Sequence, residues 1–285
     1  GKTKLAVKIA NKHNGEIISA DSRQIYCGMT IGTGKDLEDY YYKNKSISYH
    51  LIDILDPSIN YSVYKFQKDF IQSYHKITKK NKMPIICGGT GLYIESLLLN
   101  YDLSLSPPPN NRLRDKLKNK SIDELKEKLF ELDPNMSENR KMDTKNRIIR
   151  NIEVTSTLST KKRKINELPL KDFIVIGLFP GRNENIKNID NRLLHRLKNG
   201  LIEEVEYLIN NGMSHERLFY FGLEYRYVSY YLKGEIDKKE LISKLGSAIH
   251  KLAKKQMTFF RRMEKRGIKI NWVKKSNLKF INELL

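Results

Sequence analysis

The stretch Met83-Pro-Ile-Ile-Cys-Gly-Gly-Thr-Gly91 decides the fold class of this chain. Its first five residues form a short apolar run without polar alternation, which is typical of a strand buried on both faces of a parallel sheet. Two glycines follow at once, and the pattern of residues 92–99 is helical. A strand, a glycine turn and a helix in this order predict an α/β protein whose parallel sheet is flanked by helices.

Strands and helices continue to alternate on both sides of this stretch. Helices are expected at 2–12, 63–78, 92–99, 147–154, 187–211, 214–233 and 237–266. Strands are expected at 16–20, 48–53, 173–178 and 271–273, with 173–178 as a further buried strand. Asp21 directly follows the first of these strands, at the carboxyl end where α/β proteins build their sites.

A proline run, Ser106-Pro-Pro-Pro-Asn110, interrupts the alternation. The residues after it are mostly charged helix formers, such as Asp123-Glu-Leu-Lys-Glu-Lys-Leu-Phe130. We therefore expect a small all-helical insertion at 106–143. Residues 1–105 and 144–285 would then form one core with a basic C-terminal helical region, to which the helix at 147–154 returns the chain.

The chain is strongly basic. Its 285 residues include 53 Lys and Arg against 33 Asp and Glu, a net charge of +20, and residues 251–285 alone hold 11 basic and 2 acidic side chains. Such patches attract nucleic acid or an acidic membrane surface, although a Lys-rich composition explains part of the excess. No apolar run approaches 18 residues and no signal-peptide pattern is present, which argues against a membrane protein. Two cysteines exclude a disulfide framework and a zinc cluster, so we expect a cytoplasmic protein.

The first residues carry part of a phosphate-binding motif. Gly1-Lys2-Thr3 matches the last three positions of G-x-x-x-x-G-K-[ST] and runs straight into the first expected helix. In that motif the Lys reaches the outer phosphates and the Ser or Thr holds Mg²⁺. We expect the missing half of the loop and its strand to lie upstream of Gly1. The alternative is a chance tripeptide.

Four further segments complete an ordered set of motifs. They are Asp21-Ser-Arg-Gln-Ile-Tyr26, His50-Leu-Ile-Asp-Ile-Leu-Asp-Pro57, Gly88-Gly-Thr-Gly-Leu-Tyr93 and Ala253-Lys-Lys-Gln-Met-Thr-Phe-Phe-Arg261. Together with Gly1-Lys2-Thr3, this set closely resembles the tRNA isopentenyltransferase family, also called tRNA dimethylallyltransferases. The resemblance implies a P-loop kinase-like core that binds an allylic diphosphate, with Mg²⁺ as the ion. It also implies transfer of a dimethylallyl group from dimethylallyl diphosphate to the exocyclic amine of the adenosine 3′ of the anticodon.

The adenine amine is a weak nucleophile, so the reaction needs a carboxylate directed at it. The diphosphate leaving group is anionic, so the reaction also needs cationic side chains and a metal ion that stabilise its charge. By resemblance, Asp21 is the general base and Thr90 reaches the substrate. Alternatively, Asp21 caps the next segment or holds Mg²⁺ through water, and the glycine turn around Thr90 is only structural. For the diphosphate, the resemblance implies Gly1, Lys2, Thr3, Arg150 and Arg226, with Thr3 on the metal.

The implied tRNA contacts are more numerous, and the expected partner is the anticodon stem-loop of a tRNA, bound by a monomer away from any membrane. These contacts come from Asp21, Ser22, Arg23, Gln24, Thr90, Arg114, Arg147, Arg150, Tyr225, Arg226, Lys255, Gln256 and Arg261. The alternative for Arg147 and Arg150 is a solvated helix face paired with Glu153. For most aromatic residues between 220 and 231, the alternative is a place in the core.

One segment departs from the family pattern. Where the family has Arg-x-x-Gly-Tyr-Arg, this chain has Phe221-Gly-Leu-Glu-Tyr-Arg226. The replaced Arg and Gly leave two other functions open besides tRNA prenylation. One is a P-loop enzyme acting on small molecules, either a kinase or a transferase that prenylates free adenine nucleotide. The other is an inactive RNA-binding paralogue.

Overall fold

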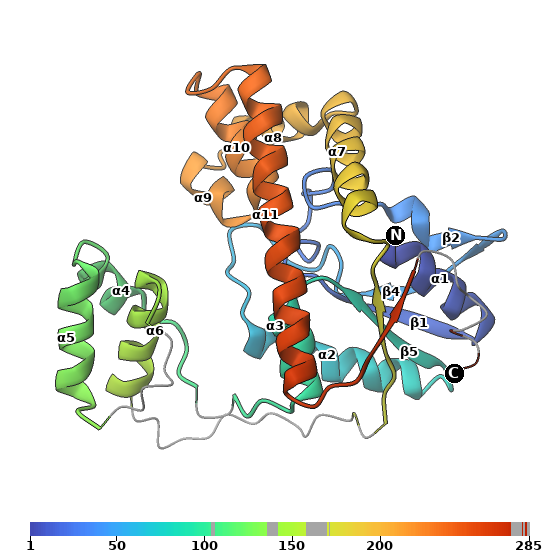
Figure 1. Cartoon of the computed structure of the whole chain (residues 1–285), viewed down its shortest axis with the longest axis horizontal. Coiled ribbons are helices and arrows are strands. Elements are labelled where there is room, and N and C mark those ends of the chain that lie inside the picture. The colour runs from blue at the N-terminus through green and yellow to red at the C-terminus, as the bar shows by residue number, and fades with distance from the viewer. Residues whose placement is uncertain are drawn as a thin grey trace. The chain divides into compact units, whose positions relative to one another are not determined.

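The computed structural model describes residues 1–103, 106–135, 142–157, 170, 172–274, 281 and 283. It divides into two compact units: Gly1–Asn100 with Glu167–Leu285, and Tyr101–Asn166 (Figure 1). The helices of the first unit are α1 (Lys2–Lys12), α2 (Val63–Thr78), α3 (Gly91–Leu98), α7 (Arg182–Lys198), α8 (Leu201–Asn210), α9 (His215–Tyr220), α10 (Leu223–Leu232) and α11 (Lys238–Lys265), with a 3-10 turn at Leu37–Tyr40. Its strands are β1 (Gly15–Ala20), β2 (Tyr41–Tyr42), β3 (Lys45–Ser46), β4 (Tyr49–His50), β5 (Met83–Gly88), β6 (Val175–Leu178) and β7 (Ile270–Val273). The second unit contains α4 (Asn111–Leu117), α5 (Ile122–Leu132) and α6 (Lys145–Ser156).

The central sheet of the first unit is parallel and has the order β4-β1-β5. Every residue of β1 is buried, and both α1 and α2 pack against β1 and β5. Ala20 and Gly88 are register partners at the carboxyl ends of β1 and β5. These ends approach so closely that a Cβ at Gly88 would lie 2.2 Å from the Ala20 carbonyl oxygen. The residues that follow both strands are therefore neighbours, as an α/β site requires.

The α/β class and the elements around the sheet are confirmed. The expected helices at 2–12 and 63–78 match α1 and α2 at both ends, and the expected strands at 16–20 and 83–87 match β1 and β5 within one residue. The strand expected at 48–53 is wrong beyond His50. Leu51 and Asp53 have φ values of 62° and 51°, a left-handed conformation that ends the strand.

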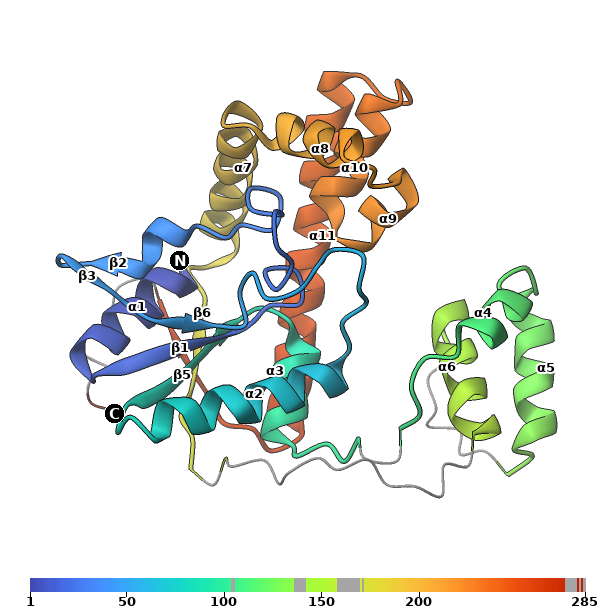
Figure 2. The ribbon, with the colours of Figure 1, turned by 180° about the vertical axis from the view of Figure 1, so that it is seen from behind.

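Two long helices expected near the C-terminus are each broken by a glycine. Gly200, with φ 97°, separates α7 from α8, and Gly222, with φ 134°, separates α9 from α10. Glycine adopts such angles without a steric cost, so the chain reverses at these points. The result is a group of short helices packed around one end of α11, seen from behind in Figure 2.

The strand expected at 173–178 is shorter and less buried than predicted. β6 begins at Val175, is only half-buried, and pairs in parallel with β7 instead of joining the central sheet. Phe173 and Ile174 just before it are exposed. An apolar run without alternation therefore marked a strand here, but it did not indicate which sheet would receive it.

The second unit has its own small apolar core. Leu125 and Leu129 of α5 pack against Ile148, Ile149 and Ile152 of α6. The helix predicted at 147–154 was expected to return the chain to the core. In the structure it packs on α5 instead, because its apolar face completes a three-helix cluster with α4 and α5.

A buried acid lies at the start of β1. Glu16 is 1% exposed and accepts hydrogen bonds from Lys82 Nζ at 2.8 Å and Lys80 Nζ at 3.1 Å, and it lies 2.7 Å from His50 Nε2. Burial acts to raise the pKa of Glu16, but the bonds from Lys82, His50 and Lys80 outweigh it and lower the pKa to about 2.

The free energy of unfolding is expected to depend on the ionisation of Glu16 at acidic pH. Because its ordinary pKa is 4.5 and its folded pKa is about 2, Glu16 stabilises the fold fully above pH 4.5, and the stabilisation is lost as the pH falls toward 2. Glu16→Gln should therefore flatten the pH dependence of the unfolding free energy in this window, measured by denaturant titration. Glu206→Gln, at an exposed position of α8, is the matched control and should leave the slope unchanged. An unchanged slope in Glu16→Gln would contradict the assignment.

Candidate active site

Asp21 and Thr90 lie side by side where β1 and β5 end. The Thr90 backbone N–H donates to the Ala20 carbonyl at 3.2 Å, and the Thr90 hydroxyl accepts from the Ser22 N–H at 2.9 Å and lies 3.2 Å from Ser22 Oγ. The Asp21 carboxylate accepts from the Arg23 N–H through Oδ1 at 2.9 Å. Within the described residues, Oδ2 accepts no hydrogen bond. The Arg23 N–H therefore orients the Asp21 carboxylate, and one carboxylate oxygen remains available.

The start of α1 reaches the same place. A Cβ on Gly89 would lie 3.7 Å from Lys2 Nζ and 3.3 Å from Gln256 Nε2, and the Gln256 amide donates to the Gly89 carbonyl at 3.2 Å. Cys87 lies within electrostatic reach of both Lys2 and Asp21. Burial raises the pKa of its thiol to about 11, Lys2 acts to lower it, and Asp21 acts to raise it. A cation, a carboxylate and a glycine turn thus share one edge of the sheet.

Gln24 does not present its amide to a ligand in this structure. Its carbonyl oxygen accepts from Ser19 Oγ at 3.2 Å, and its amide donates to the Gly34 carbonyl at 2.9 Å. The side chain therefore links the end of β1 to the loop at residues 28–35. These hydrogen bonds fix the orientation of the side chain for which the resemblance implied a contact with tRNA.

The loop at residues 28–35 is held by a carboxylate that no sequence motif indicates. Glu204 of α8 accepts hydrogen bonds from three consecutive backbone N–H groups, those of Thr30, Ile31 and Gly32, at 2.8, 2.7 and 3.0 Å. Consecutive backbone amides of this kind form an anion-binding concavity, and here the protein fills it with its own side chain. A glycine-containing loop signals such a concavity, but nothing in the sequence points to Glu204 as its occupant.

Tyr225 lies in the interior. It is fully buried, and its hydroxyl donates to the same Glu204 carboxylate at 2.7 Å. Burial and the neighbouring carboxylate both raise the pKa of Tyr225. The resemblance implied a tRNA contact for Tyr225, with a place in the core as the alternative. In the structure its side chain lies in the core, between α8 and the loop at residues 28–35.

Phe221 and Glu224, the two residues that depart from the family motif, each contact other side chains of the protein. Phe221 is 1% exposed, with its ring centroid 4.9 Å from that of Tyr26. Glu224 forms an ion pair with Arg196 of α7 at 3.2 Å, and the Arg196 guanidinium lies against Gly34. Burial raises the pKa of Glu224, while Arg196 acts in the opposite direction. The segment is therefore well packed and keeps a cation near the loop.

Three further basic residues among the predicted tRNA contacts, Arg226, Lys255 and Arg261, lie exposed on helices. Arg226 of α10 donates to the Phe219 carbonyl at 3.3 Å. Lys255 and Arg261 of α11 are exposed and share a face with Lys251, Lys254 and Lys265. Side chains three or four residues apart along an α-helix lie on the same face, as Lys254 and Lys255 do with Lys251 and Lys265 does with Arg261. α11 runs past α3 at one end and α10 at the other (Figure 1), and Gln256 anchors its middle to the glycine turn.

The three arginines expected in or after the insertion all lie in the second unit. Arg114 and Arg150 both donate to the fully buried Glu153, at 2.6 and 2.9 Å. Burial acts to raise the pKa of Glu153, but hydrogen bonds from Arg114 and Arg150 and from the Asn110 N–H outweigh it and keep the pKa below its ordinary value. Arg147 is half-exposed and pairs with Asp143. The pairing with Glu153 that the sequence left open is thus present for Arg150, although the acid is buried rather than solvated.

The start of α1 offers an oxygen donor suited to a divalent metal ion. Thr3 carries a hydroxyl oxygen, a hard donor of the kind that Mg²⁺ takes while it keeps waters and substrate phosphates. The described residues contain no group of three or more His, Cys, Asp or Glu that would hold a metal by itself. This donor set suits an ion that arrives with a phosphate ligand.

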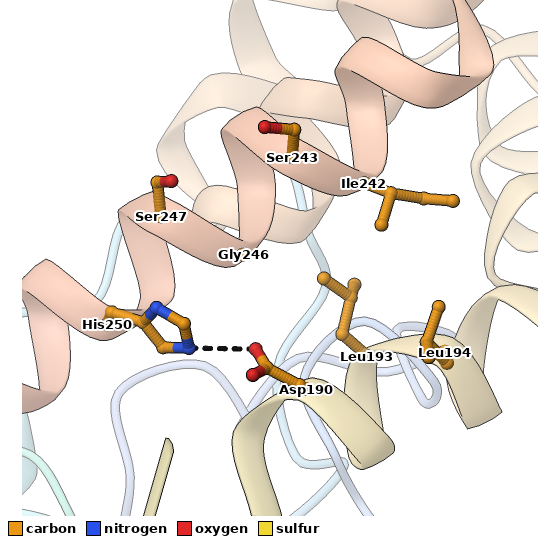
Figure 3. A pocket seen from close by; sticks show the side chains of 8 residues that line it. All are labelled: Asp190, Leu193, Leu194, Ile242, Ser243, Gly246, Ser247 and His250. Atoms are coloured by element: carbon orange, nitrogen blue, oxygen red, sulfur yellow. Dashed lines mark hydrogen bonds and ion pairs between the residues drawn. The ribbon is translucent and has the colours of Figure 1, made fainter. Parts of the chain in front are cut away.

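A separate hollow of about 250 Å³ lies between α7 and α11. Leu193 and Ile242 line it, and the His250 Nε2 and Asp190 Oδ1 atoms meet at one end, 2.8 Å apart (Figure 3). None of the residues expected in the active site lines this hollow. Among the helices of the described segments, none is long and apolar enough to cross a membrane.

Comparison with known proteins identifies the family. The family model described as IPP transferase matches residues 24–263. tRNA dimethylallyltransferase 1 of Azobacteroides pseudotrichonymphae genomovar. CFP2 is 46% identical over 285 residues, which are 100% of this chain and 92% of that protein. tRNA dimethylallyltransferase 2 of Phocaeicola vulgatus is 44% identical over 273 residues, 96% of this chain and 88% of that protein. The solved tRNA isopentenylpyrophosphate transferase of Bacillus halodurans has a TM-score of 0.69 and 28% identity, covering 100% of this chain and 90% of that one.

These matches confirm the resemblance that the ordered motifs indicated. They cover both units and include the glycine turn, Asp21 and the basic helix α11. Since the family model spans most of the chain and a relative of more than 40% identity covers all of it, this chain belongs to the IPP transferase family.

Proposed function

We propose that this protein transfers a dimethylallyl group from dimethylallyl diphosphate to the exocyclic amine of the adenosine 3′ of the anticodon in tRNA. The observation that carries the proposal is the meeting of Lys2, Asp21 and the turn at Gly89 and Thr90 on one edge of the sheet. A cation for the leaving group and a carboxylate for the amine are the two charges that this reaction needs. The family membership of the chain and the printed names of its relatives agree with it.

Asp21 is the proposed general base. Its Oδ1 is occupied by the Arg23 N–H, so Oδ2 is the oxygen that accepts a hydrogen bond from the adenine amine. As the amine nitrogen forms a bond to the allylic carbon, it becomes cationic and loses one proton to this oxygen. Hydrogen bonds between Thr90 and Ser22 tie the backbone that carries Asp21 to the glycine turn.

The leaving group is proposed to lie at the start of α1. When the bond between the allylic carbon and the diphosphate oxygen breaks, its electron pair stays on the diphosphate. Lys2 and the backbone N–H groups of the first helical turn stabilise this charge, since the N-terminus of a helix favours anions. Mg²⁺, held there by Thr3 and the phosphates, would neutralise further charge on the leaving group.

The RNA is proposed to follow the basic face of α11. Lys255 and Arg261 are exposed there, and Gln256 on the same helix is anchored to the turn that holds Asp21. Phosphate contacts from such side chains supply affinity that does not depend on sequence. The three-helix second unit is proposed as a further tRNA-contacting element, with the exposed Arg147 among its accessible cations. We also propose that the protein acts as a cytoplasmic monomer, in keeping with two cysteines that form no disulfide.

The test is incorporation of label from dimethylallyl diphosphate. The protein is incubated with labelled donor, Mg²⁺, and either an anticodon stem-loop or free AMP. Label should enter the RNA and should disappear when the target adenosine is replaced by guanosine. Label in AMP but not in RNA would support the free-nucleotide transferase instead. RNA binding without incorporation would support the inactive paralogue, and phosphate transfer from ATP to a small molecule would support the kinase.

A further inference from the structure

One carboxylate of α8 holds the loop at residues 28–35 through its backbone. Glu204 Oε2 accepts from the N–H groups of Thr30 and Ile31 at 2.8 and 2.7 Å. Glu204 Oε1 accepts from the Gly32 N–H at 3.0 Å and from the Tyr225 hydroxyl at 2.7 Å. Each oxygen therefore accepts two hydrogen bonds, and the carboxylate fills a concavity that offers four donors to one anion.

The loop is also packed against two side chains of neighbouring helices. A Cβ on Gly32 would lie 2.5 Å from Tyr225 Cζ, so the tyrosine ring of α10 rests directly on the loop backbone. Gly34 has φ 67°, and the Arg196 guanidinium of α7 lies so close to it that a Cβ there would collide with the side chain. The conformation of the loop is therefore set by α7, α8 and α10 together.

The same loop supports the segment that follows β1 and carries Asp21. The Gln24 amide donates to the Gly34 carbonyl at 2.9 Å. The Lys35 ammonium, which is buried, donates to the Tyr26 carbonyl. The segment is therefore joined to the loop at two points, one of them only three residues beyond Asp21.

We propose that Glu204 is a positioning residue for the reaction, because it fixes the loop that keeps the segment with Asp21 in the catalytic geometry. This inference rests on the proposed function. Without the carboxylate, three neighbouring N–H groups and one hydroxyl lose their acceptor, and the loop must rearrange to satisfy them. The hydrogen bonds to Gln24 and Tyr26 transmit this rearrangement toward Asp21. A displacement of about 1 Å in a catalytic site can cost on the order of 10²-fold in rate.

The test is chemical rescue of a truncated side chain. Glu204→Ala leaves a half-buried site with four donors that a small carboxylate can fill. In single-turnover prenyl transfer to an anticodon stem-loop, this variant should have a rate constant about 10- to 100-fold below that of the wild type. The amplitude of the reaction and the KM for dimethylallyl diphosphate should stay at wild-type values, because Lys2 and Thr3, proposed for the donor, lie on α1 and take no part in the contacts described above.

Acetate should restore most of the lost rate constant, compared with sodium chloride at the same ionic strength. It should also raise the melting temperature of Glu204→Ala, since it binds the folded state, and should leave that of the wild type unchanged. Glu204→Gln is the steric control: its amide fills the site but turns a donor toward the N–H groups, so the rate constant should fall and acetate should not restore it. Glu203→Ala removes an exposed acid from the same turn of α8 and should have wild-type kinetics with or without acetate.

A wild-type rate constant in Glu204→Ala would overturn the proposal, and so would the absence of any effect of acetate on this variant. A lowered amplitude with an unchanged rate constant would mean that Glu204 only maintains the fold. A raised KM for dimethylallyl diphosphate with a normal rate constant would place the loop at the donor site, which also contradicts the proposal. Failure of the proposed function appears separately, as absence of prenyl transfer by the wild type.

Discussion

Replacing Asp21 with alanine is expected to lower kcat for prenyl transfer by a factor of about 10²–10⁴, the range for loss of a general base. The physical reason is that the amine nitrogen cannot become neutral after attack unless a nearby group takes its proton. Oδ2 of Asp21 is the carboxylate oxygen left without a donor among the described residues of the turn. Single-turnover incorporation of label into a stem-loop, with all substrates saturating, measures this effect on the chemical step.

The control for this prediction is binding of the same stem-loop. Asp21 carries a negative charge, so its removal should leave affinity for the polyanionic RNA equal or slightly higher. Asp21→Asn should be almost as slow as Asp21→Ala, because an amide keeps the shape and the hydrogen bond from Arg23 but accepts no proton. Glu206→Gln, an exposed acid on α8, should have wild-type turnover. An Asp21→Asn variant with normal kcat would remove proton acceptance by Asp21 from the mechanism.

Lys2→Met is expected to lower kcat/KM for dimethylallyl diphosphate by a factor of about 10²–10³, the usual cost of deleting one donor to a developing anion. Methionine keeps the length of the side chain and removes the charge, which lies beside Gly89 and close to Cys87. Since the charge on the diphosphate grows as the bond breaks, part of the loss should appear in kcat. Steady-state kinetics with varied donor and saturating RNA separates this part from the loss in KM.

Lys8→Met is the matched control, because Lys8 is exposed on the same helix, almost two turns from its start. It should leave both constants unchanged. Lys2→Arg should recover part of the activity, since a guanidinium also binds phosphate oxygens. Lys2→Met with normal donor kinetics and weakened RNA binding would move Lys2 from the diphosphate site to the RNA interface.

The parts of the fold that could be predicted are those whose signals are local. A short apolar run before two glycines indicated β5 and its turn, and the pattern of apolar residues gave both ends of α2, where the Ser62 hydroxyl accepts from the Lys65 N–H. The same signals placed Asp21 and Thr90 at the ends of their strands, and the structure brings these residues together. The breaks at Gly200 and Gly222 were missed because a glycine within a helical pattern is tolerated in some contexts and ends the helix in others.

The sequence by itself determined the α/β class, the elements around the central sheet, the family and a short list of reactive residues. Only the tertiary structure decided that Glu204 holds the loop at residues 28–35, that Arg114 pairs with Glu153, and that Arg23 stacks on Tyr220. The physical reason is the range of the interactions. Periodicity and capping act within a few residues, whereas these contacts join residues 39 to 197 positions apart, so their partners are selected by the packing of whole elements.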